Sequence, residues 1–246
     1  MAHVSLKQVS QEYPIITARS QAIKTALFTR LGGRISAHDR TVVVRALNAI
    51  DLELTDGDRL GIVGHNGAGK STILKVISRI YEPQAGTVTV SGTLSSLVDI
   101  TLGMDSEASG WENIRFRGAF MGLTNAQTRA LAPSIADFSE LGDYLDMPLR
   151  TYSSGMYMRL AFAIATSVQP EIIVMDEMIG AGDANFVDKA VARLDAMLGQ
   201  SKILVVASHS NATIRKFCNK VLWLSKGEAH AFGPVDQILA AFEGAS

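Results

Sequence analysis

Residues 64–71 have the pattern of a phosphate-binding loop. They read Gly-His-Asn-Gly-Ala-Gly-Lys-Ser and fit G-x-x-x-x-G-K-[ST]. The glycines let the backbone curl until successive N–H groups point inward at phosphate oxygens, and the start of the next helix adds partial positive charge. Lys70 is expected to reach the β- and γ-phosphates of a nucleotide, and the Ser71 hydroxyl to bind Mg²⁺. A glycine-rich turn with an incidental Lys-Ser pair is the alternative interpretation.

Two acids and a histidine follow later apolar runs. Asp176 and Glu177 come directly after the apolar residues 172–175. A phosphate-loop protein needs an acid at the tip of a neighbouring strand to hold the Mg²⁺ shell, which is the role predicted for Asp176. Glu177 is expected to align and deprotonate the attacking water as a general base. His209 follows the apolar run 203–207, where it could hydrogen-bond the γ-phosphate or that water. Taken alone, strand-capping acids and a surface histidine would explain these residues.

Apolar runs that alternate with amphipathic runs must position these side chains. Residues 60–63 are wholly apolar, which is typical of a strand buried on both faces, and they lead into the phosphate loop. The loop is followed by a helix with Ile73, Leu74, Ile77 and Ile80 on one face. Further strands are expected at residues 4–9, 47–54, 86–90, 93–98, 172–175, 203–207 and 221–224, and further helices at 21–31, 186–198, 211–217 and after Pro234.

The middle of the chain differs from both ends. Residues 111–147 have few β-branched runs and many helix formers, which predicts a helical subdomain at about 105–168. Asp56-Gly57 predicts a hairpin turn, and Lys226-Gly227 a later turn. The whole pattern predicts an α/β fold in one domain, residues 1–246. This fold has a mostly parallel sheet covered by helices, an antiparallel β portion near the N-terminus and the inserted helical subdomain.

Composition narrows the function classes. The chain has 246 residues, with 23 Lys and Arg against 24 Asp and Glu, for a net charge of -1. This balance excludes a strongly basic protein held on nucleic acid by bulk charge. The single cysteine excludes an intrachain disulfide framework. No run approaches the ~18 apolar residues that a membrane helix needs. The mean hydropathy of +0.18 is high, which indicates a large core or a surface that docks on something apolar.

Together these motifs resemble the ATP-binding subunit of an ABC transporter, in the same order and over nearly the whole chain. Residues 152–156 read Tyr-Ser-Ser-Gly-Met where that family usually has L-S-G-G-Q, so Ser153 and Gly155 match its second and fourth positions. The resemblance implies a P-loop NTPase with an ABC-type nucleotide-binding domain that hydrolyses ATP. It also implies two copies that enclose two ATP molecules, because this segment serves the ATP of the other protomer. A serine helix cap is the alternative for this segment alone.

The resemblance also implies a set of ligand contacts. Tyr13 is the expected adenine platform, unless it is a loop tyrosine that packs only for itself. The family's Q-loop glutamine has no counterpart between Gln84 and Gln127, and Asp99 is the nearest polar candidate. The ATP-binding set is Tyr13, Gly64, Asn66, Gly67, Ala68, Gly69, Lys70, Ser71, Thr72, Ser153, Gly155 and Asp183, and the Mg²⁺ set is Ser71, Asp176 and Asp99.

Several details resemble the branch of the family that exports polysaccharides such as O-antigen, capsule or teichoic acid. They are the insertion at about 14–41, the segment Ser-Gly-Trp-Glu-Asn-Ile at 109–114, the Tyr-Ser-Ser-Gly-Met signature, Gly182-Asp183 and Ser208-His209-Ser210. This branch implies a separate integral-membrane permease, which contacts the polysaccharide. It also implies a peripheral location on the cytoplasmic face of the membrane, and docking through residues 14–41 and the helical subdomain. We expect no C-terminal carbohydrate-binding domain.

Three other functions compete with this one. The chain could serve another ABC transporter, an importer or a drug exporter. Soluble ABC-type ATPases that act on DNA or the ribosome carry long coiled coils or tandem modules, and the sequence shows neither. A different P-loop enzyme, such as a nucleotide kinase, would lack both the segment around Ser153 and the histidine at 209.

Overall fold

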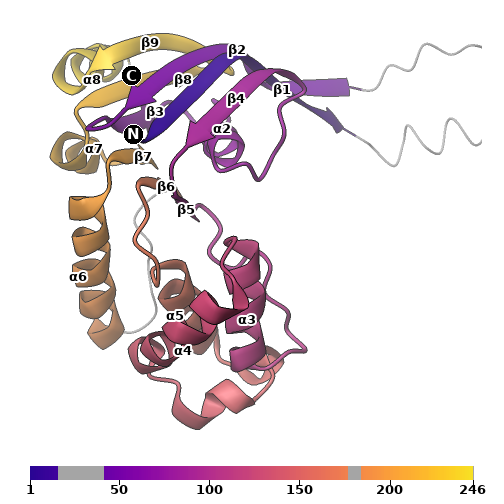
Figure 1. Cartoon of the computed structure of the whole chain (residues 1–246). Coiled ribbons are helices and arrows are strands. Elements are labelled where there is room, and N and C mark those ends of the chain that lie inside the picture. The colour runs from indigo at the N-terminus through magenta and orange to yellow at the C-terminus, as the bar shows by residue number, and fades with distance from the viewer. Residues whose placement is uncertain (16–41, 177–183, 246) are drawn as a thin grey trace, which may run out of the picture.

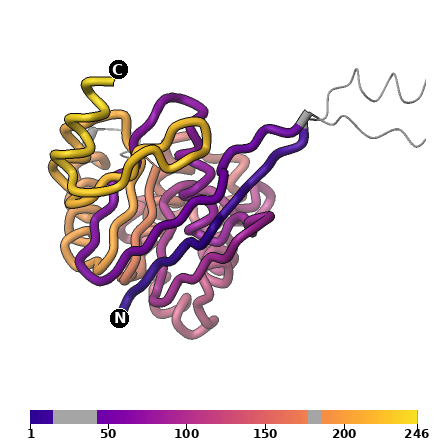
Figure 2. The backbone as a smooth tube through the Cα atoms, turned by 90° about the horizontal axis from the view of Figure 1, so that it is seen from above, coloured from indigo at the N-terminus to yellow at the C-terminus, as the bar shows by residue number. Residues whose placement is uncertain are grey.

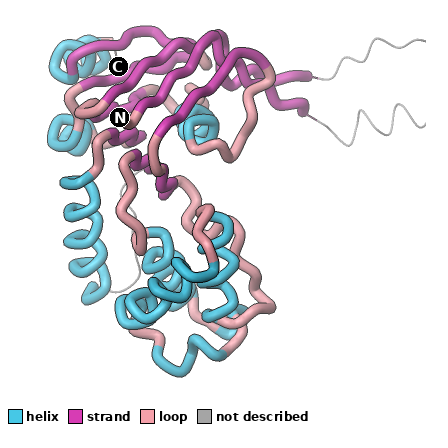
Figure 3. The backbone as a smooth tube through the Cα atoms, in the orientation of Figure 1, coloured by secondary structure: helices cyan, strands magenta, loops and turns pink. Residues whose placement is uncertain are grey.

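The computed structural model describes residues 1–15, 42–176 and 184–245. The β-sheets gather at one end of the molecule and most of residues 105–168 form a separate group of helices at the other (Figures 1 and 3). The predicted helix at 21–31 falls outside the described residues. The α/β architecture with an inserted helical subdomain is confirmed.

Two sheets form the β-rich end. Strands β1 (His3–Ile15), β2 (Val42–Thr55) and β4 (Ala85–Ser91) make an antiparallel sheet in the order β2-β1-β4. The second sheet has the order β5-β6-β7-β3-β8-β9. Its strands are β3 (Arg59–Val63), β5 (Leu94–Leu97), β6 (Ile172–Asp176), β7 (Ile203–Ala207), β8 (Lys220–Ser225) and β9 (Glu228–Pro234). Pairing is parallel from β5 to β8, and only the β8–β9 pair is antiparallel among these.

Helix α2 (Lys70–Ile77) packs between the two sheets. Its residues Ile73, Leu74 and Ile77 are 0% exposed and share one apolar cluster with β1, β2 and the parallel sheet. Because strand residues alternate between faces, Ile172 and Val174 of β6 face this cluster while Ile173 and Met175 face the other. Three helices, α6 (Ala184–Gln200), α7 (Asn211–Phe217) and α8 (Val235–Gly244), cover that opposite face. The parallel sheet is therefore buried on both sides, as its continuous apolar runs require.

The helical subdomain has its own core. It contains α3 (Gly110–Phe120), α4 (Asn125–Ser139), α5 (Ser154–Ala165) and two short 3₁₀ turns, Gly142–Asp146 and Leu149–Thr151. Ser109 and Thr124 start α3 and α4 with complete capping boxes. The buried core residues are Ile114, Ile135, Leu141, Leu145, Leu149, Leu160, Ala163 and Ile164. A separate core allows this group of helices to act as a unit.

The local structure differs from the sequence analysis in three places. Asp56-Gly57 does form a turn, but β2 pairs with β1 while β3 joins the parallel sheet, so no hairpin forms. The wholly apolar β3 needs burial on both faces, and only the parallel sheet provides it. The strand β9 was not predicted, because its sequence contains no β-branched residue and ends in Gly-Pro. The first strand runs to Ile15 rather than Val9, so Tyr13 lies on a strand.

Candidate functional site

A cavity of about 360 Å³ opens where β3, β6 and β7 of the parallel sheet end. The carboxyl ends of parallel strands are the usual ligand-binding edge of such sheets. The lining residues are Tyr13, Val44, Ala46, Asn66, Gly67, Gly69, Lys70, Ser71, Thr72, Asp176, Ser208 and His209. This nucleotide cavity therefore gathers most of the predicted residues, including Tyr13 from a distant strand.

Close backbone contacts fix the phosphate loop. Gly64 has φ 151°, and a Cβ there would lie 2.3 Å from the carbonyl oxygen of Leu224. Gly69 has φ 107°, and its Cβ would lie 2.5 Å from the carbonyl oxygen of Ala46. A side chain at either position would have to push backbone atoms aside. Gly69 also precedes α2 without supplying a capping side chain, so it offers no oxygen to the first N–H groups of the helix. That is the arrangement an incoming phosphate needs.

Lys70 lies inside this loop. Its side chain is 9% exposed, and its Nζ donates to the carbonyl oxygens of Gly64 at 2.6 Å and of His65 at 3.2 Å. The loop thus holds the ammonium group at the cavity wall. A bound phosphate group could exchange some of these carbonyl contacts for charge-assisted ones.

Ser71 and Asp176 meet across the nucleotide cavity. The Ser71 hydroxyl, in the first turn of α2, donates to Asp176 Oδ2 at 2.7 Å, and Asp176 is the last residue of β6. A hydroxyl and a carboxylate are the hard oxygen donors that Mg²⁺ prefers. These two residues therefore fit a Mg²⁺ ion held beside the phosphate loop.

His209 is held by a short serine-rich turn. Ser208 is 5% exposed, and its hydroxyl accepts a hydrogen bond from the Ser210 N–H at 3.0 Å. The Ser210 hydroxyl caps α7 by accepting from the Thr213 N–H at 3.2 Å. These contacts place His209 between the end of β7 and the start of α7, on the cavity wall. Ser208 was not predicted as a cavity residue, although its position beside His209 could have indicated it.

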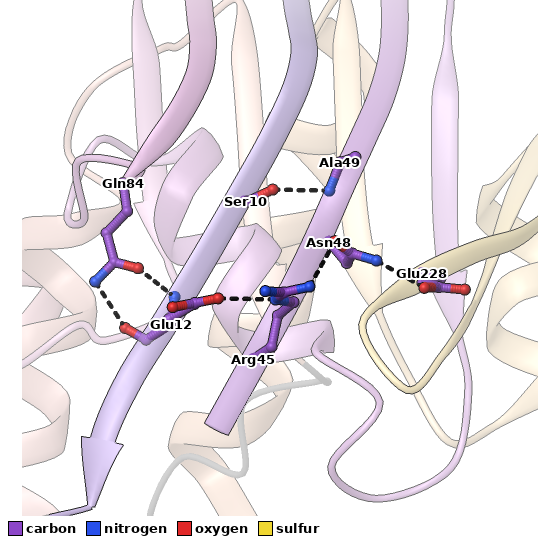
Figure 4. Close-up of polar contacts among 7 residues, drawn as sticks. All are labelled: Ser10, Glu12, Arg45, Asn48, Ala49, Gln84 and Glu228. Carbon is purple, nitrogen blue, oxygen red and sulfur yellow. Dashed lines mark hydrogen bonds and ion pairs between the residues drawn. The ribbon is translucent and has the colours of Figure 1, made fainter. Parts of the chain in front are cut away.

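A polar chain braces the strand that carries Tyr13 (Figure 4). Gln84 bonds both backbone groups of Glu12, at 2.8 and 3.1 Å, and the Glu12 carboxylate pairs with Arg45 at 2.8 Å. The chain continues through Asn48, which donates to Glu228 on β9 at 2.7 Å. Tyr13 is thereby fixed at the cavity mouth.

The surroundings of Tyr13 suit a flat ligand. The centroids of the Tyr13 and Tyr81 rings lie 6.0 Å apart in an edge-on arrangement. Tyr81 therefore does not cover both faces of the Tyr13 ring. Tyr13 pairs with Val44 across β1 and β2, which explains why Val44 also lines the cavity. Val44 and Ala46 were missed in the sequence. The strand register explains Val44, and Ala46 lies at a register shift of the same strand pair. An aromatic ring beside small apolar groups suits an adenine base.

Other predicted residues lie elsewhere. Ser153 caps α5 by accepting from the Met156 N–H at 3.2 Å. Outside the backbone of its own helix, a Cβ on Gly155 would have Ser153 Oγ, at 3.9 Å, as its nearest neighbour among the described residues. Both residues belong to the helical subdomain and do not line the nucleotide cavity. Gly64 and Ala68 shape the phosphate loop without lining the cavity. Glu177 and Asp183 fall outside the described residues.

Asp99 is not brought to the Mg²⁺ pair. It lies on a second cavity of about 340 Å³, here called the subdomain cavity, between the end of α2, β5 and α3. Its carboxylate accepts from the Thr101 hydroxyl at 2.7 Å. The lining residues are Ser78, Arg79, Ile80, Leu94, Ser95, Ser96, Asp99, Leu102, Arg117, Phe120, Met121 and Ala165. The metal role predicted for Asp99 has no support in this geometry.

The subdomain cavity contains two unsatisfied polar atoms. Arg117 is 3% exposed; its Nη1 donates to the carbonyl of Leu102, but its Nε has no hydrogen-bond partner among the described residues. The Ser78 hydroxyl also lacks one. Burial lowers the pKa of Arg117, and the charge of Asp99 opposes that shift. Buried polar groups without partners are costly, so these two atoms reduce the stability gained by packing around this cavity.

Comparison with known proteins places the chain in a family. The sequence model of ABC transporters matches residues 47–180. The O-antigen export system ATP-binding protein RfbE of Yersinia enterocolitica is 43% identical, over 92% of this chain and 96% of its own length. RfbB of Myxococcus xanthus, with the same description, is 38% identical over 98% of this chain and 56% of its own. The teichoic acids export ATP-binding protein TagH of Listeria monocytogenes is 33% identical, over 98% of this chain and 69% of its own length.

Solved structures show the same fold. An ATP-binding subunit of an ABC transporter superimposes with a TM-score of 0.67 at 20% identity, covering 98% of this chain and 93% of its own. A dimeric ATP-binding cassette with ADP and phosphate, in a post-hydrolysis state, superimposes with a TM-score of 0.64 at 20% identity. The match covers 94% of this chain and 98% of that structure's chain. The phosphate loop, the Ser71–Asp176 pair and these matches lead to one conclusion: the chain belongs to the ABC transporter family.

Proposed function

We propose that this protein is the ATP-hydrolysing subunit of an ABC exporter that powers transport of a polysaccharide across the cytoplasmic membrane. The observation that carries the ATPase role is the contact of Ser71 with Asp176 beside the buried Lys70. The polysaccharide class is supported by the relatives, whose names describe O-antigen and teichoic acid export. The name of the 43% identical relative supports O-antigen as the substrate, and we propose that it is exported in lipid-linked form.

Each cavity residue has a task in this proposal. The phosphate loop and Lys70 bind the phosphates, while Tyr13 stacks on adenine. Ser71 and Asp176 would hold Mg²⁺, which offsets negative charge on the transferring phosphoryl group when bound. His209 donates a hydrogen bond to the γ-phosphate or the attacking water, and Glu177 takes the proton from that water.

A second copy of the chain completes the proposed site. Ser153 and Gly155 cap α5 at a point that does not line the chain's own nucleotide cavity. A helix N-terminus with a hydroxyl and little neighbouring bulk is suited to a phosphate from elsewhere. In a head-to-tail dimer these residues and Asp183 meet the ATP held by the partner, so that ATP binding closes the dimer and hydrolysis reopens it.

The permease is proposed to dock on the helical subdomain, close to the subdomain cavity. None of the helices in the described ranges is long and apolar enough to cross a bilayer. Phe116 and Phe120 lie one turn apart on α3 and are 42% and 58% exposed, and the Phe120 ring lies 5.4 Å from the guanidinium of the buried Arg117. We infer that a permease segment with an acidic side chain pairs with Arg117. The protein is then peripheral on the cytoplasmic face, with residues 14–41 as a second docking surface.

The test of the ATPase role is Glu177→Gln. It is expected to retain ATP binding, to trap a dimer detectable by light scattering and to abolish turnover, because the amide cannot accept the proton. Normal hydrolysis by this variant would remove Glu177 from the mechanism. The export role is tested by glycan labelling in cells that express the protein with its permease. Unchanged surface glycan after its deletion would contradict the export proposal and leave ATP hydrolysis intact.

A further inference from the structure

The last turn of α8 contacts two loops that border the nucleotide cavity. The helix lies beside β9 and close to α7 (Figure 1), and its residues Ile238 and Leu239 are 6% and 0% exposed. This burial anchors α8 to the parallel sheet. Phe242 and Glu243 follow in the last turn, and neither was singled out by the sequence.

Phe242 contacts the phosphate loop. Its ring centroid lies 6.0 Å from that of His65, with the planes tilted by 51°. The His65 carbonyl accepts from Lys70 Nζ at 3.2 Å and from the Ala68 N–H at 3.1 Å. A shift of His65 would therefore move a group that positions the Lys70 ammonium.

Glu243 contacts the helix that follows His209. One carboxylate oxygen accepts from Asn211 Nδ2 at 3.0 Å, and both accept from Arg215 Nη2 at 2.9 and 3.0 Å. Asn211 is the first residue of α7, two positions after His209. Glu243 therefore holds the start of α7 through two side chains one turn apart, and with it one end of the loop that carries His209.

We propose that Phe242 and Glu243 are positioning residues for the nucleotide site. One turn of α8 fixes the phosphate loop through His65 and the His209 loop through Asn211 and Arg215. The inference rests on the proposed ATPase function and adds a site of control outside the cavity. Movement of α8 alters both loops together, and nucleotide binding is transmitted to α8 in return, because such coupling is reciprocal.

Kinetic parameters separate the two contacts. Phe242→Ala is expected to raise KM for ATP about 3- to 10-fold with kcat nearly unchanged, because the loop that binds phosphate is loosened. Glu243→Gln is expected to lower kcat by a similar factor with KM nearly unchanged, and Phe242→Tyr to behave as wild type. A merely structural role would change Tm and active fraction without this split.

Matched controls use neighbours that lack the loop contacts. Phe232→Ala removes a ring of β9 that is 47% exposed, and Asp236→Asn removes a partner of Arg215, at 3.2 Å, that does not reach Asn211. Both controls should stay within about twofold of wild type. Equal effects of Glu243→Gln and Asp236→Asn would overturn the role of Glu243.

A fluorescence measurement tests the coupling without turnover. Trp223 lies 5.4 Å from Phe242, and Trp111→Phe leaves it as the single tryptophan, because the chain has 2. Adding MgATP should change its emission, and Phe242→Ala should abolish the change while equilibrium dialysis still detects bound ATP. Unchanged emission with ATP bound to the Trp111→Phe protein would overturn the inference alone. Absence of ATP binding by wild type in dialysis would instead refute the proposed function, and the inference with it.

Discussion

The nucleotide cavity and the subdomain cavity have similar volumes, about 360 and 340 Å³, but differ in whether their polar side chains are hydrogen-bonded within the chain. In the first, Lys70 and Ser71 are hydrogen-bonded to their own chain. In the second, Ser78 Oγ and Arg117 Nε have no partner among the described residues. A site whose polar groups are hydrogen-bonded within the chain can fold before its ligand arrives. A site with orphaned groups gains most from a partner that satisfies them.

The largest effect is expected in the nucleotide cavity. Lys70→Ala should reduce ATP hydrolysis by at least about 10²-fold, because a preorganised positive group at the phosphates is lost. Phosphate release is the measurement, with Lys7→Ala, an exposed lysine of β1, as the control. If Lys70→Ala keeps more than a tenth of the wild-type rate, this cavity does not bind the phosphates.

In the subdomain cavity, loss of the buried charge is expected to preserve stability but to weaken binding of the partner. Arg117→Met is expected to keep or raise Tm, because a buried charge whose Nε lacks a hydrogen-bond partner among the described residues is removed, yet to weaken binding to the permease at least about tenfold. Calorimetry and co-purification with the permease give the two values. Arg115→Met on the same helix, where the side chain is exposed, should leave both unchanged. A lower Tm with normal co-purification would make Arg117 a structural residue.

A smaller effect on ATP affinity is expected at the base-binding end of the nucleotide cavity. Tyr13→Ala should weaken ATP binding about 5- to 10-fold, equivalent to roughly 1–1.5 kcal/mol for one aromatic stack, while Tyr13→Phe should bind normally. Calorimetric titration with ATP gives the affinity. Equal affinity of the alanine variant would show that the ring packs only within the protein.

The smallest effect concerns a second buried ionisable group. Burial raises the pKa of the Cys218 thiol to about 12, so unlike Arg117 it stays neutral in the folded protein. The raised pKa adds stability below the unfolded value of about 8.5, and this contribution declines as pH rises toward 12. Wild type should therefore lose about 0.7 kcal/mol more unfolding free energy between pH 8 and 9 than Cys218→Ala does. Parallel urea-unfolding profiles for the two proteins would contradict this.

How far the sequence predicts the structure differs between the two cavities. The nucleotide cavity is built mostly from one motif and strand ends, so Lys70, Ser71, Asp176 and His209 could be placed by spacing alone. The subdomain cavity joins α2, β5 and α3, and no local pattern links Ser78 to Arg117. Asp99 shows the limit, because the sequence offered it as a metal ligand, but the turn that carries it, just after β5, lines the other cavity. The contacts of α8 likewise depend on tertiary packing.

The pairing of β1 with β2 has a consequence for what the fold can accommodate. The two strands remain paired beyond the last contact of β1 with β4, Ser10 with Ala85, and continue to Ile15 opposite Val42 (Figure 2). The chain thus leaves and re-enters the sheet at neighbouring positions. Each doubling of a segment joined there adds only about 0.6 kcal/mol of closure entropy. The end of the β1–β2 pair is therefore a position where inserted segments of different length can be exchanged while the ATP-binding core keeps its structure.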